Sequence, residues 1–592
     1  MKRIVVGALA VIGGLVVCIV VAGVLVNLFF GGSTAIPAKT ILEADLEQEV
    51  REYNLDDPVI ELVREPAMTV RDVVDALQHA AQDDRVVAFV ARLGAVGMGL
   101  AHTQEIRDAV LTFRQAGKKA VAYAETFGEF GPGNSAYYLA SAFDTIYLQP
   151  SGDVGFTGLV FESPFLKGTL EKLALTPRLD HRYEYKNFMN IFTERQYTAP
   201  HQEANQQVMA SQFGQMVRGI AAERHLSETE LRQRIDHGPF LGEEAVAAGL
   251  VDGLAYRDEV YGRVQDKAGE EARLLFLSQY LARAGRPHRK GTVVALIYGV
   301  GPVRRGPSGY DALSNGPAMG ADTVTAAFRA AVKDEAVKAI LFRVDSPGGS
   351  YVASDAIWRE TQRAREAGKP VIVSMANVAG SGGYFVAMAA DKIVAQPGTI
   401  TGSIGVLGGK MLTADFWSQL GLSWDEVHTS TNATMWSSTH DYTPEQWARL
   451  QAWLDRVYHD FTSKVAAGRH LPLEKVLEVA RGRIWSGEDA KGLGLVDELG
   501  GFPVALRLVR EALTLPADAA LDLQVFPRPV STFDALMTRL FGEDRESSEV
   551  RELTVFLTHL RRLIRPMARL AQSLGLSPRQ DVLMMPELRP EN

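Results

Sequence analysis

GGYFVAMAADKIVAQPGTITGSIG (382–405) matches SAYYLASAFDTIYLQPSGDVGFTG (135–158), which stands 247 residues earlier in the chain. The residues matched at this offset include Tyr137 with Tyr384, Asp144 with Asp391, Gln149-Pro150 with Gln396-Pro397, and Gly155 with Gly402. Similar segments precede and follow both stretches in the same order, as an internal duplication requires. We therefore predict two copies of one domain, over residues 55–285 and 292–515, followed by a helical tail over 516–592.

Each copy alternates short runs of β-forming residues with helical patterns. In the second copy, strands are predicted over 339–344, 371–375 and 392–396, and helices near 353–367 and 382–390. This alternation is typical of parallel β–α–β units, so the predicted fold class is α/β with two tandem domains. The stretch RRGPSGYDALSNGPAMGAD (304–322) is rich in glycine and proline, and we predict a loop there inside the second copy.

The N-terminus carries a long uncharged stretch. Residues 4–30 contain no charged side chain, and about 20 apolar residues suffice to span a bilayer. A secretory signal usually has an apolar core of only about 7–15 residues, which favours an uncleaved anchor here. Because Lys2 and Arg3 precede the stretch, the positive-inside rule makes residues 1–31 a cytoplasmic tip and a transmembrane helix. The rest of the chain is then predicted to lie outside the cytoplasm.

The composition argues against several classes of function. The net charge is −9 and the sequence pI is about 5.8, which disfavours nucleic-acid binding. The single cysteine, Cys18, allows neither an intrachain disulfide nor a cysteine-ligated metal, and no nucleotide-binding P-loop is present. We therefore predict no metal and no cofactor. Residues 550–574 have the pattern of a basic amphipathic helix, which either packs on a neighbouring element or faces the membrane.

A serine stands at a position suited to nucleophilic chemistry. The stretch NVAGSGGYF (377–385) places Ser381 between glycines, directly after the apolar run PVIVSM (370–375). A strand followed by such a turn exposes a hydroxyl on a sharp bend, so Ser381 is a candidate nucleophile. A serine needs a base to remove its proton, and histidine is the usual one. His181 and His428 occupy equivalent places in the two copies, which favours a structural role for both.

Comparison of the two copies points to a lysine as the base. Lys186 of the first copy aligns with Ala433 of the second. Ser381 aligns with Asn134, and Ser135 is one place away. Each copy therefore keeps one half of a Ser-Lys pair. A lysine acts as a base only when it is neutral, and apolar neighbours such as those around Lys186 lower its pKa. The alternative is an exposed lysine early in an amphipathic helix.

Acyl transfer also requires backbone N–H groups that stabilise the oxyanion, and glycines of the second copy are candidates to supply them. In the segment DSPGGS, Gly348 and Gly349 follow a predicted strand and let the backbone approach a substrate closely. The N–H of Gly382, next to the nucleophile, is another candidate donor. The corresponding segment of the first copy, LGAVGMG, lacks the motif. Ser403 aligns with Phe156, and its hydroxyl would orient the lysine, although a simple Gly-Ser turn explains it equally well.

Together these features resemble the signal peptide peptidase A family, also called protease IV, in its long tandem-domain bacterial form. The shared motifs are the N-terminal anchor, the tandem copies, DSPGGS, AGSGGYF, TGSIG and the Tyr185-Lys186 pair. The resemblance implies a crotonase/ClpP-like fold and a serine endopeptidase with a Ser-Lys dyad. It assigns Ser381 as the nucleophile, Lys186 as the general base and Ser403 as the hydroxyl that orients the lysine.

The resemblance also implies partners and a cellular place. It implies a homotetramer with a hydrophobic specificity groove that degrades cleaved signal peptides and other apolar peptides. It places the catalytic domains on the periplasmic, extracytoplasmic side of the bacterial inner membrane, with residues 4–30 in the lipid bilayer. No nucleic acid is expected as a partner.

Two other classes of function remain open at this stage. Crotonase-like folds also carry acyl-CoA chemistry, in which paired glycine N–H groups polarise a thioester, and a fold alone does not settle function. A catalytically inactive, membrane-tethered scaffold is the second alternative. Retention of one complementary Ser-Lys pair argues against the scaffold, and the N-terminal anchor argues against the acyl-CoA enzyme.

Overall fold

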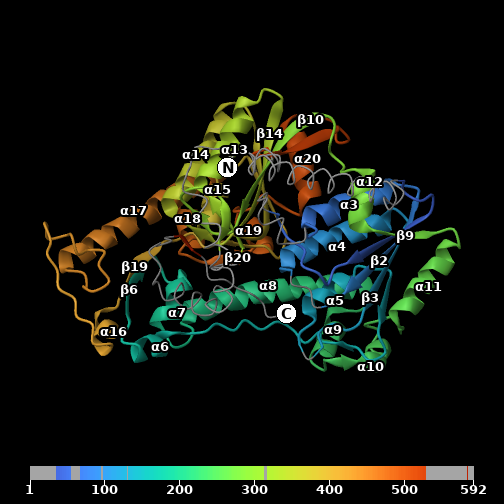
Figure 1. Ribbon diagram of the computed structural model, residues 1–592, viewed down its shortest axis with the longest axis horizontal. Coiled ribbons are helices and arrows are strands. Elements are labelled where there is room, and N and C mark those ends of the chain that lie inside the picture. Colours follow the sequence, from blue (N-terminus) through green and yellow to red (C-terminus); the bar gives the residue numbers. More distant parts are fainter. Residues whose placement is uncertain are drawn as a thin grey trace, which may run out of the picture.

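The computed structural model describes residues 35–54, 67–94, 98–129, 131–311, 316–528 and 583–584. The predicted anchor and the amphipathic pattern at 550–574 lie outside these ranges. No helix within them has the length and apolar character of a membrane span. The described chain forms two large β-sheets flanked by helices, the first at the right and the second at the top centre of Figure 1.

The first copy is built on a six-stranded sheet in which all neighbouring strands are parallel. In order across the sheet the strands are β8 (Gly253–Leu254), β4 (Thr145–Leu148), β3 (Lys119–Ala124), β2 (Val86–Leu93), β1 (Thr40–Asp45) and β9 (Arg273–Phe276). The run VVAFVARL of β2 is almost wholly buried, because strands of a parallel sheet are covered on both faces.

Helices of the first copy flank this sheet or extend toward the second copy (Figure 1). They are α3 (Val70–Gln82), α4 (Leu100–Gln115), α5 (Asn134–Ala140), α6 (Lys167–Lys172), α7 (Asn190–Thr193), α8 (Ala199–Arg224), α9 (Glu228–Ile235), α10 (Gly242–Ala247), α11 (Arg257–Ala268) and α12 (Leu277–Ala284). A short antiparallel pair, β5 (Asp153–Val154) and β7 (Phe240–Leu241), lies outside the main sheet.

The second copy repeats this plan. Its parallel strands are, in order, β21 (Glu498–Leu499), β17 (Lys392–Ala395), β16 (Val371–Gly380), β14 (Val337–Ser346), β10 (Thr292–Val300) and β22 (Leu521–Phe526). Two further strands, β18 (Ile400–Gly402) and β20 (Ile484–Ser486), extend from the carboxyl end of β16. The helices are α13 (Ala321–Lys333), α14 (Tyr351–Glu366), α15 (Gly382–Ala387), α16 (Ala414–Gln419), α17 (Pro444–Arg469), α18 (Leu473–Val479), α19 (Gly487–Gly492) and α20 (Phe502–Ala512).

Strand order and side-chain contacts both recur between the copies. The order β8-β4-β3-β2-β1-β9 corresponds strand for strand to β21-β17-β16-β14-β10-β22. The Tyr137 hydroxyl donates to the Leu250 carbonyl at 2.7 Å, and the Tyr384 hydroxyl donates to the Leu495 carbonyl at 2.9 Å. The duplication read from the sequence is therefore present in the fold as well.

The boundaries of the copies differ from those predicted. The first sheet begins at Thr40 rather than after residue 55, because the buried run TILEAD forms its strand β1. The predicted helical tail begins with a strand instead: the alternating run LDLQVF forms β22 and completes the second sheet. Each copy therefore extends beyond its predicted limits by one strand.

The Gly- and Pro-rich stretch 304–322 is not a loop throughout. It contains β12 (Gly309–Asp311) and β13 (Gly316–Gly320), which pair antiparallel, and β13 also pairs with β11 (Val303–Arg304). The glycines and prolines therefore mark the ends and turns of a small sheet rather than an unstructured segment.

The two copies are joined by elements of the first copy that reach the second. Strand β6 (Thr176–His181) pairs antiparallel with β19 (Leu407–Leu412), and α8 packs against β20 (Figure 1). The segment that follows β6 carries Lys186, so this pairing brings a first-copy lysine to the second-copy sheet.

Candidate active site

Ser381 occupies the turn between strand β16 and helix α15. Its backbone has φ 54° and ψ −115°, a left-handed conformation that is unfavourable for a residue with a side chain. The Ser381 N–H donates to the Gly402 carbonyl at 2.8 Å, which ties the turn to the neighbouring strand β18. The predicted strand–turn–helix context of Ser381 is thus present, but the serine is fully buried rather than exposed as predicted.

Lys186 reaches Ser381 from the other copy. Its Nζ lies 2.7 Å from the Ser381 Oγ. The lysine directly precedes the 3-10 helix Asn187–Met189, and its exposed fraction is 1%. Burial holds the pKa of the Lys186 amine well below its usual value, because the charged form loses its hydration. The alternative of an exposed lysine is therefore wrong.

Ser403 provides the other two contacts of the Lys186 amine. Nζ lies 2.9 Å from the Ser403 carbonyl oxygen and 3.0 Å from the Ser403 Oγ. A neutral amine has two N–H donors and one lone pair. The two N–H groups can serve the two oxygens of Ser403, which leaves the lone pair to accept the hydroxyl proton of Ser381. Ser403 is itself buried and has a left-handed backbone, with φ 51°.

The segment Arg481-Gly482 of the second copy holds the backbone of Lys186 in place. The Tyr185 N–H donates to the Arg481 carbonyl at 3.2 Å. A Cβ added to Gly482 would lie 2.5 Å from the Lys186 nitrogen and 2.6 Å from its Cα, and Gly482 has φ +83°. Sequence reasoning missed Gly482, because it is almost 300 residues from Lys186 and belongs to no recognisable motif.

Gly482→Ala is expected to reduce kcat by about 100-fold, because a shift of about 1 Å in a positioned catalytic group costs about that much. The added methyl group requires Lys186 to move away from Ser381. The matched control is Gly492→Ala at the end of α19, where a Cβ meets nothing within 4 Å and wild-type kcat is expected. Peptide hydrolysis and thermal unfolding of both variants provide the measurement, and wild-type kcat in Gly482→Ala would disprove the positional role.

The three glycines predicted to bind an oxyanion lie together beside Ser381. Gly348 and Gly349 form the short strand β15, with φ 101° and 152°. A Cβ on Gly382 would lie 3.0 Å from the Gly349 nitrogen and 3.2 Å from the Gly348 Cα. The Gly348 N–H donates to the Ser346 Oγ at 3.2 Å. Backbone atoms of all three glycines therefore approach the turn that carries Ser381.

Strand β15 has a partner on each side. Gly349 pairs with Val303 of β11 on one side. On the other side β15 pairs antiparallel with β23 (Leu583–Met584), a short strand near the C-terminus. The β15 edge next to the nucleophile can therefore accept an extended polypeptide.

The two histidines considered from the sequence lie in different surroundings. His181 is the last residue of β6 and is half-buried, and burial lowers its pKa. His428 is exposed and lies outside any helix or strand. The equivalence inferred from the alignment therefore does not extend to the structure. Neither histidine is among the hydrogen-bond partners of Ser381 or Lys186 within the described parts of the chain.

Comparison with known proteins identifies the family of this chain. The family model described as "Peptidase family S49" matches residues 112–271 and 363–515, one segment in each copy. The chain is 31% identical to Protease 4 of Salmonella typhi, over 80% of this chain and 76% of that protein. It is 28% identical to the chloroplastic serine protease SPPA of Arabidopsis thaliana, over 79% of this chain and 69% of that protein.

Among solved structures, a ClpP1 mutant from Listeria monocytogenes aligns with a TM-score of 0.23 and 14% identity. The alignment covers 36% of this chain and 94% of the ClpP1 chain. The family assignment rests on the sequence matches, which span both copies. The chain belongs to peptidase family S49 and is a serine peptidase.

Proposed function

We propose that Ser381 and Lys186 are the catalytic dyad of an endopeptidase whose active site is shared between the two copies. The observation that carries the proposal is the 2.7 Å separation of the Lys186 Nζ and the Ser381 Oγ, with both side chains buried. Burial favours the neutral amine, which is the form that a general base requires. In this role Ser403 orients the amine through the contacts at 2.9 and 3.0 Å.

The proposed reaction is acyl transfer in two stages. Lys186 takes the hydroxyl proton as the Ser381 Oγ attacks the peptide carbonyl, and the backbone N–H groups of Gly349 and Gly382 stabilise the oxyanion. The lysine then gives its proton to the leaving amine, which departs and leaves an acyl ester on Ser381. In the second stage Lys186 takes a proton from water as the water oxygen attacks the ester carbon. The bond between that carbon and the Ser381 Oγ then breaks, the carboxylic acid product leaves, and Lys186 returns the proton to the Oγ.

We propose that the substrate binds as an extended strand along β15. Main-chain hydrogen bonds to a free strand edge are a common way to bind peptides of varied sequence. The antiparallel pairing of Leu583–Met584 with Gly348–Gly349 supports this mode, since an extended segment occupies this edge, and a substrate strand would take the place of that segment. A peptide in this position would present a carbonyl group to Ser381 next to the glycine N–H groups.

The cellular setting is also a proposal. Residues 4–30 are uncharged and long enough to anchor the chain in the bacterial inner membrane, with the catalytic domains on the extracytoplasmic side. Cleaved signal peptides and other apolar peptides are the proposed substrates, since a membrane-anchored peptidase meets them where they are released. The homotetramer implied by the family resemblance is part of the same proposal.

The proposed nucleophile is tested by covalent labelling. A fluorophosphonate probe is expected to modify the detergent-solubilised full-length chain, and peptide mapping is expected to find the adduct on Ser381. The Lys186→Ala variant is expected to react far more slowly, because its serine has no base. An adduct on a different serine, or no adduct in an active preparation, would contradict the dyad. An acyl-CoA enzyme would keep its activity in Lys186→Ala, and an inactive scaffold would not be labelled.

A further inference from the structure

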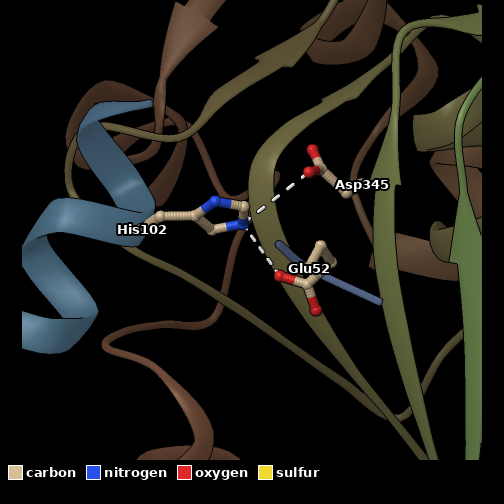
Figure 2. A group of neighbouring side chains, drawn as sticks. All are labelled: Glu52, His102 and Asp345. Atoms are coloured by element: carbon tan, nitrogen blue, oxygen red, sulfur yellow. Dashed lines mark hydrogen bonds and ion pairs between the residues drawn. The ribbon is translucent and has the colours of Figure 1, made fainter. Parts of the chain in front are cut away.

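A buried cluster of charged side chains lies between the two copies, separate from the Ser-Lys pair. His102 of helix α4 and Glu52, both from the first copy, meet Asp345 of strand β14 in the second copy (Figure 2). The His102 Nε2 lies 2.8 Å from the Glu52 Oε2 and 3.7 Å from the Asp345 Oδ2. The charged groups therefore face each other across the contact between the copies.

Arg343 forms ion pairs with Glu52 of this cluster and with Glu105 of α4. It is fully buried in β14 and donates from Nε and Nη2 to the two oxygens of Glu52, at 2.8 and 2.9 Å. Its Nη2 also donates to Glu105 at 2.8 Å, and its Nη1 donates to Ser374 at 2.8 Å. Burial tends to raise the pKa of Glu52, but Arg343 and His102 outweigh it and lower the pKa to about 2. Glu52 is therefore a fixed anion and a fixed hydrogen-bond acceptor.

Asn377 determines which ring nitrogen of His102 carries the proton. The backbone N–H of His102 donates to the Asn377 Oδ1 at 3.1 Å, which fixes the orientation of the amide. The Asn377 Nδ2 then lies 2.8 Å from the His102 Nδ1, so Nδ1 must accept a hydrogen bond. The proton of the neutral ring is consequently on Nε2, where it is donated to Glu52. Each ring nitrogen has a separate partner, one in each copy.

The second-copy partners of His102 stand immediately before the proposed catalytic groups. Asp345 is followed by Ser346-Pro347 and the glycines of β15, and Asn377 stands four residues before Ser381. The Val378 N–H donates to the Asp345 Oδ1 at 2.9 Å, which joins the ends of β14 and β16. A displacement of Asn377 would therefore also displace Ser381, and a displacement of Asp345 would displace the glycines of β15, because only a few backbone residues separate them.

We propose that His102 is a positioning residue for peptide hydrolysis, which holds the carboxyl end of β16 through Asn377 and so sets the position of Ser381 relative to Lys186. This inference rests on the proposed dyad. The geometry that carries it is the pair of contacts between α4 and Asn377, one from the backbone of His102 and one from its ring. Since α4 belongs to the copy that supplies Lys186, these contacts link the scaffolds of the two proposed catalytic residues.

The spacing of Glu52, His102 and Asp345 would also suit a metal ion. Arg343 already uses both oxygens of Glu52, and the His102 Nε2 carries the proton that it donates. A cation at this place would have to displace a buried guanidinium group, so the cluster is better suited to positioning than to metal binding.

Two substitutions separate the functions of the two ring nitrogens. In His102→Asn the side-chain oxygen takes the place of Nδ1 and can accept from Asn377, whereas the contact with Glu52 is lost. In His102→Gln the side-chain amide takes the place of Nε2 and can donate to Glu52, whereas the acceptor for Asn377 is lost. The matched control is Arg218→Ala, which removes an exposed ion pair between the copies, Arg218 with Glu488, away from β14 and β16.

The experiment measures kcat and KM for an apolar fluorogenic peptide, with the active sites counted by fluorophosphonate titration. His102→Gln is expected to lower kcat by about 10- to 100-fold with KM nearly unchanged, because the misplaced group is catalytic rather than substrate-binding. His102→Asn is expected to keep kcat within about threefold of wild type, since the Asn377 contact persists. Arg218→Ala is expected to behave as wild type.

The outcomes distinguish this inference from the proposed function. Wild-type kcat in His102→Gln, or an equal loss in both His102 variants that follows their loss of thermal stability, would overturn the positioning role alone. A wild-type chain that shows no Ser381-dependent hydrolysis would overturn the proposed dyad, and the positioning role with it.

Discussion

Ser381→Ala is expected to lower kcat for peptide hydrolysis by at least about 10⁴-fold, because removal of the nucleophile from a catalytic unit leaves only binding and oxyanion stabilisation. KM is expected to change little, since the β15 edge that we propose to bind the substrate is intact. The measurement is steady-state cleavage of an apolar fluorogenic peptide by the full-length chain in detergent.

The first copy supplies a matched control for this substitution. Ser135 stands one place from the position that aligns with Ser381, and it is also buried. Ser135→Ala is expected to retain wild-type kcat, because the Lys186 amine contacts Ser381 and Ser403. A loss of activity in Ser135→Ala that equals the loss in Ser381→Ala, or full activity in Ser381→Ala, would disprove the assignment of the nucleophile.

Lys186→Met is expected to reduce kcat as severely as the loss of the nucleophile, by about 10⁴-fold or more. The effects of substitutions within one catalytic unit are not additive, because loss of either member disables the whole unit. Methionine has a similar length and fills the same apolar space without a proton acceptor. In the wild type, kcat/KM is expected to fall as the pH drops below the native pKa of Lys186, since protonation removes the base. Lys172→Met on α6, where the lysine is exposed, is the control and is expected to keep wild-type activity.

The same substitution has a second, independent readout in the pH dependence of stability. Burial lowers the pKa of Lys186 in the folded state, so between that pKa and the unfolded value of about 10.4 the unfolded chain binds one more proton. The contribution of this lysine to the free energy of unfolding therefore rises with pH, by up to about 1.4 kcal/mol per pH unit, and is lost as the pH falls.

Urea unfolding of the wild type and of Lys186→Met at several pH values above neutrality measures this contribution. The wild type is expected to gain stability relative to the variant as the pH rises, because methionine does not titrate. Parallel stability curves would show that Lys186 keeps its charge in the folded state, and would contradict its role as a base even if the variant were inactive.

The sequence predicted that Ser381 and Lys186 meet, but it did not predict the residues that hold them in place. Ser381 and Lys186 could be paired because the duplicated copies had each lost the opposite residue, a signal that needs no three-dimensional information. The alternation of the short runs 339–344, 371–375 and 392–396 with helical patterns likewise predicted a parallel sheet, which β14, β16 and β17 form.

Contacts between distant segments could not be predicted in this way. Gly482 lies 296 residues from Lys186 and His102 lies 275 residues from Asn377, and neither is conspicuous within its own segment. Strands β1 and β22 were missed because each is a single short run beyond the region in which the copies resemble each other. Such strands are fixed by pairing with the rest of the sheet, which a local pattern does not reveal.

The division of the Ser-Lys pair between the copies has a consequence for inheritance. Tandem duplications are usually unstable, because recombination between the repeats deletes one of them and restores the single gene. Here such a deletion would leave either an amine without its hydroxyl or a hydroxyl without its amine. Because the proposed catalytic dyad needs one residue from each repeat, selection for peptide hydrolysis would retain both repeats together.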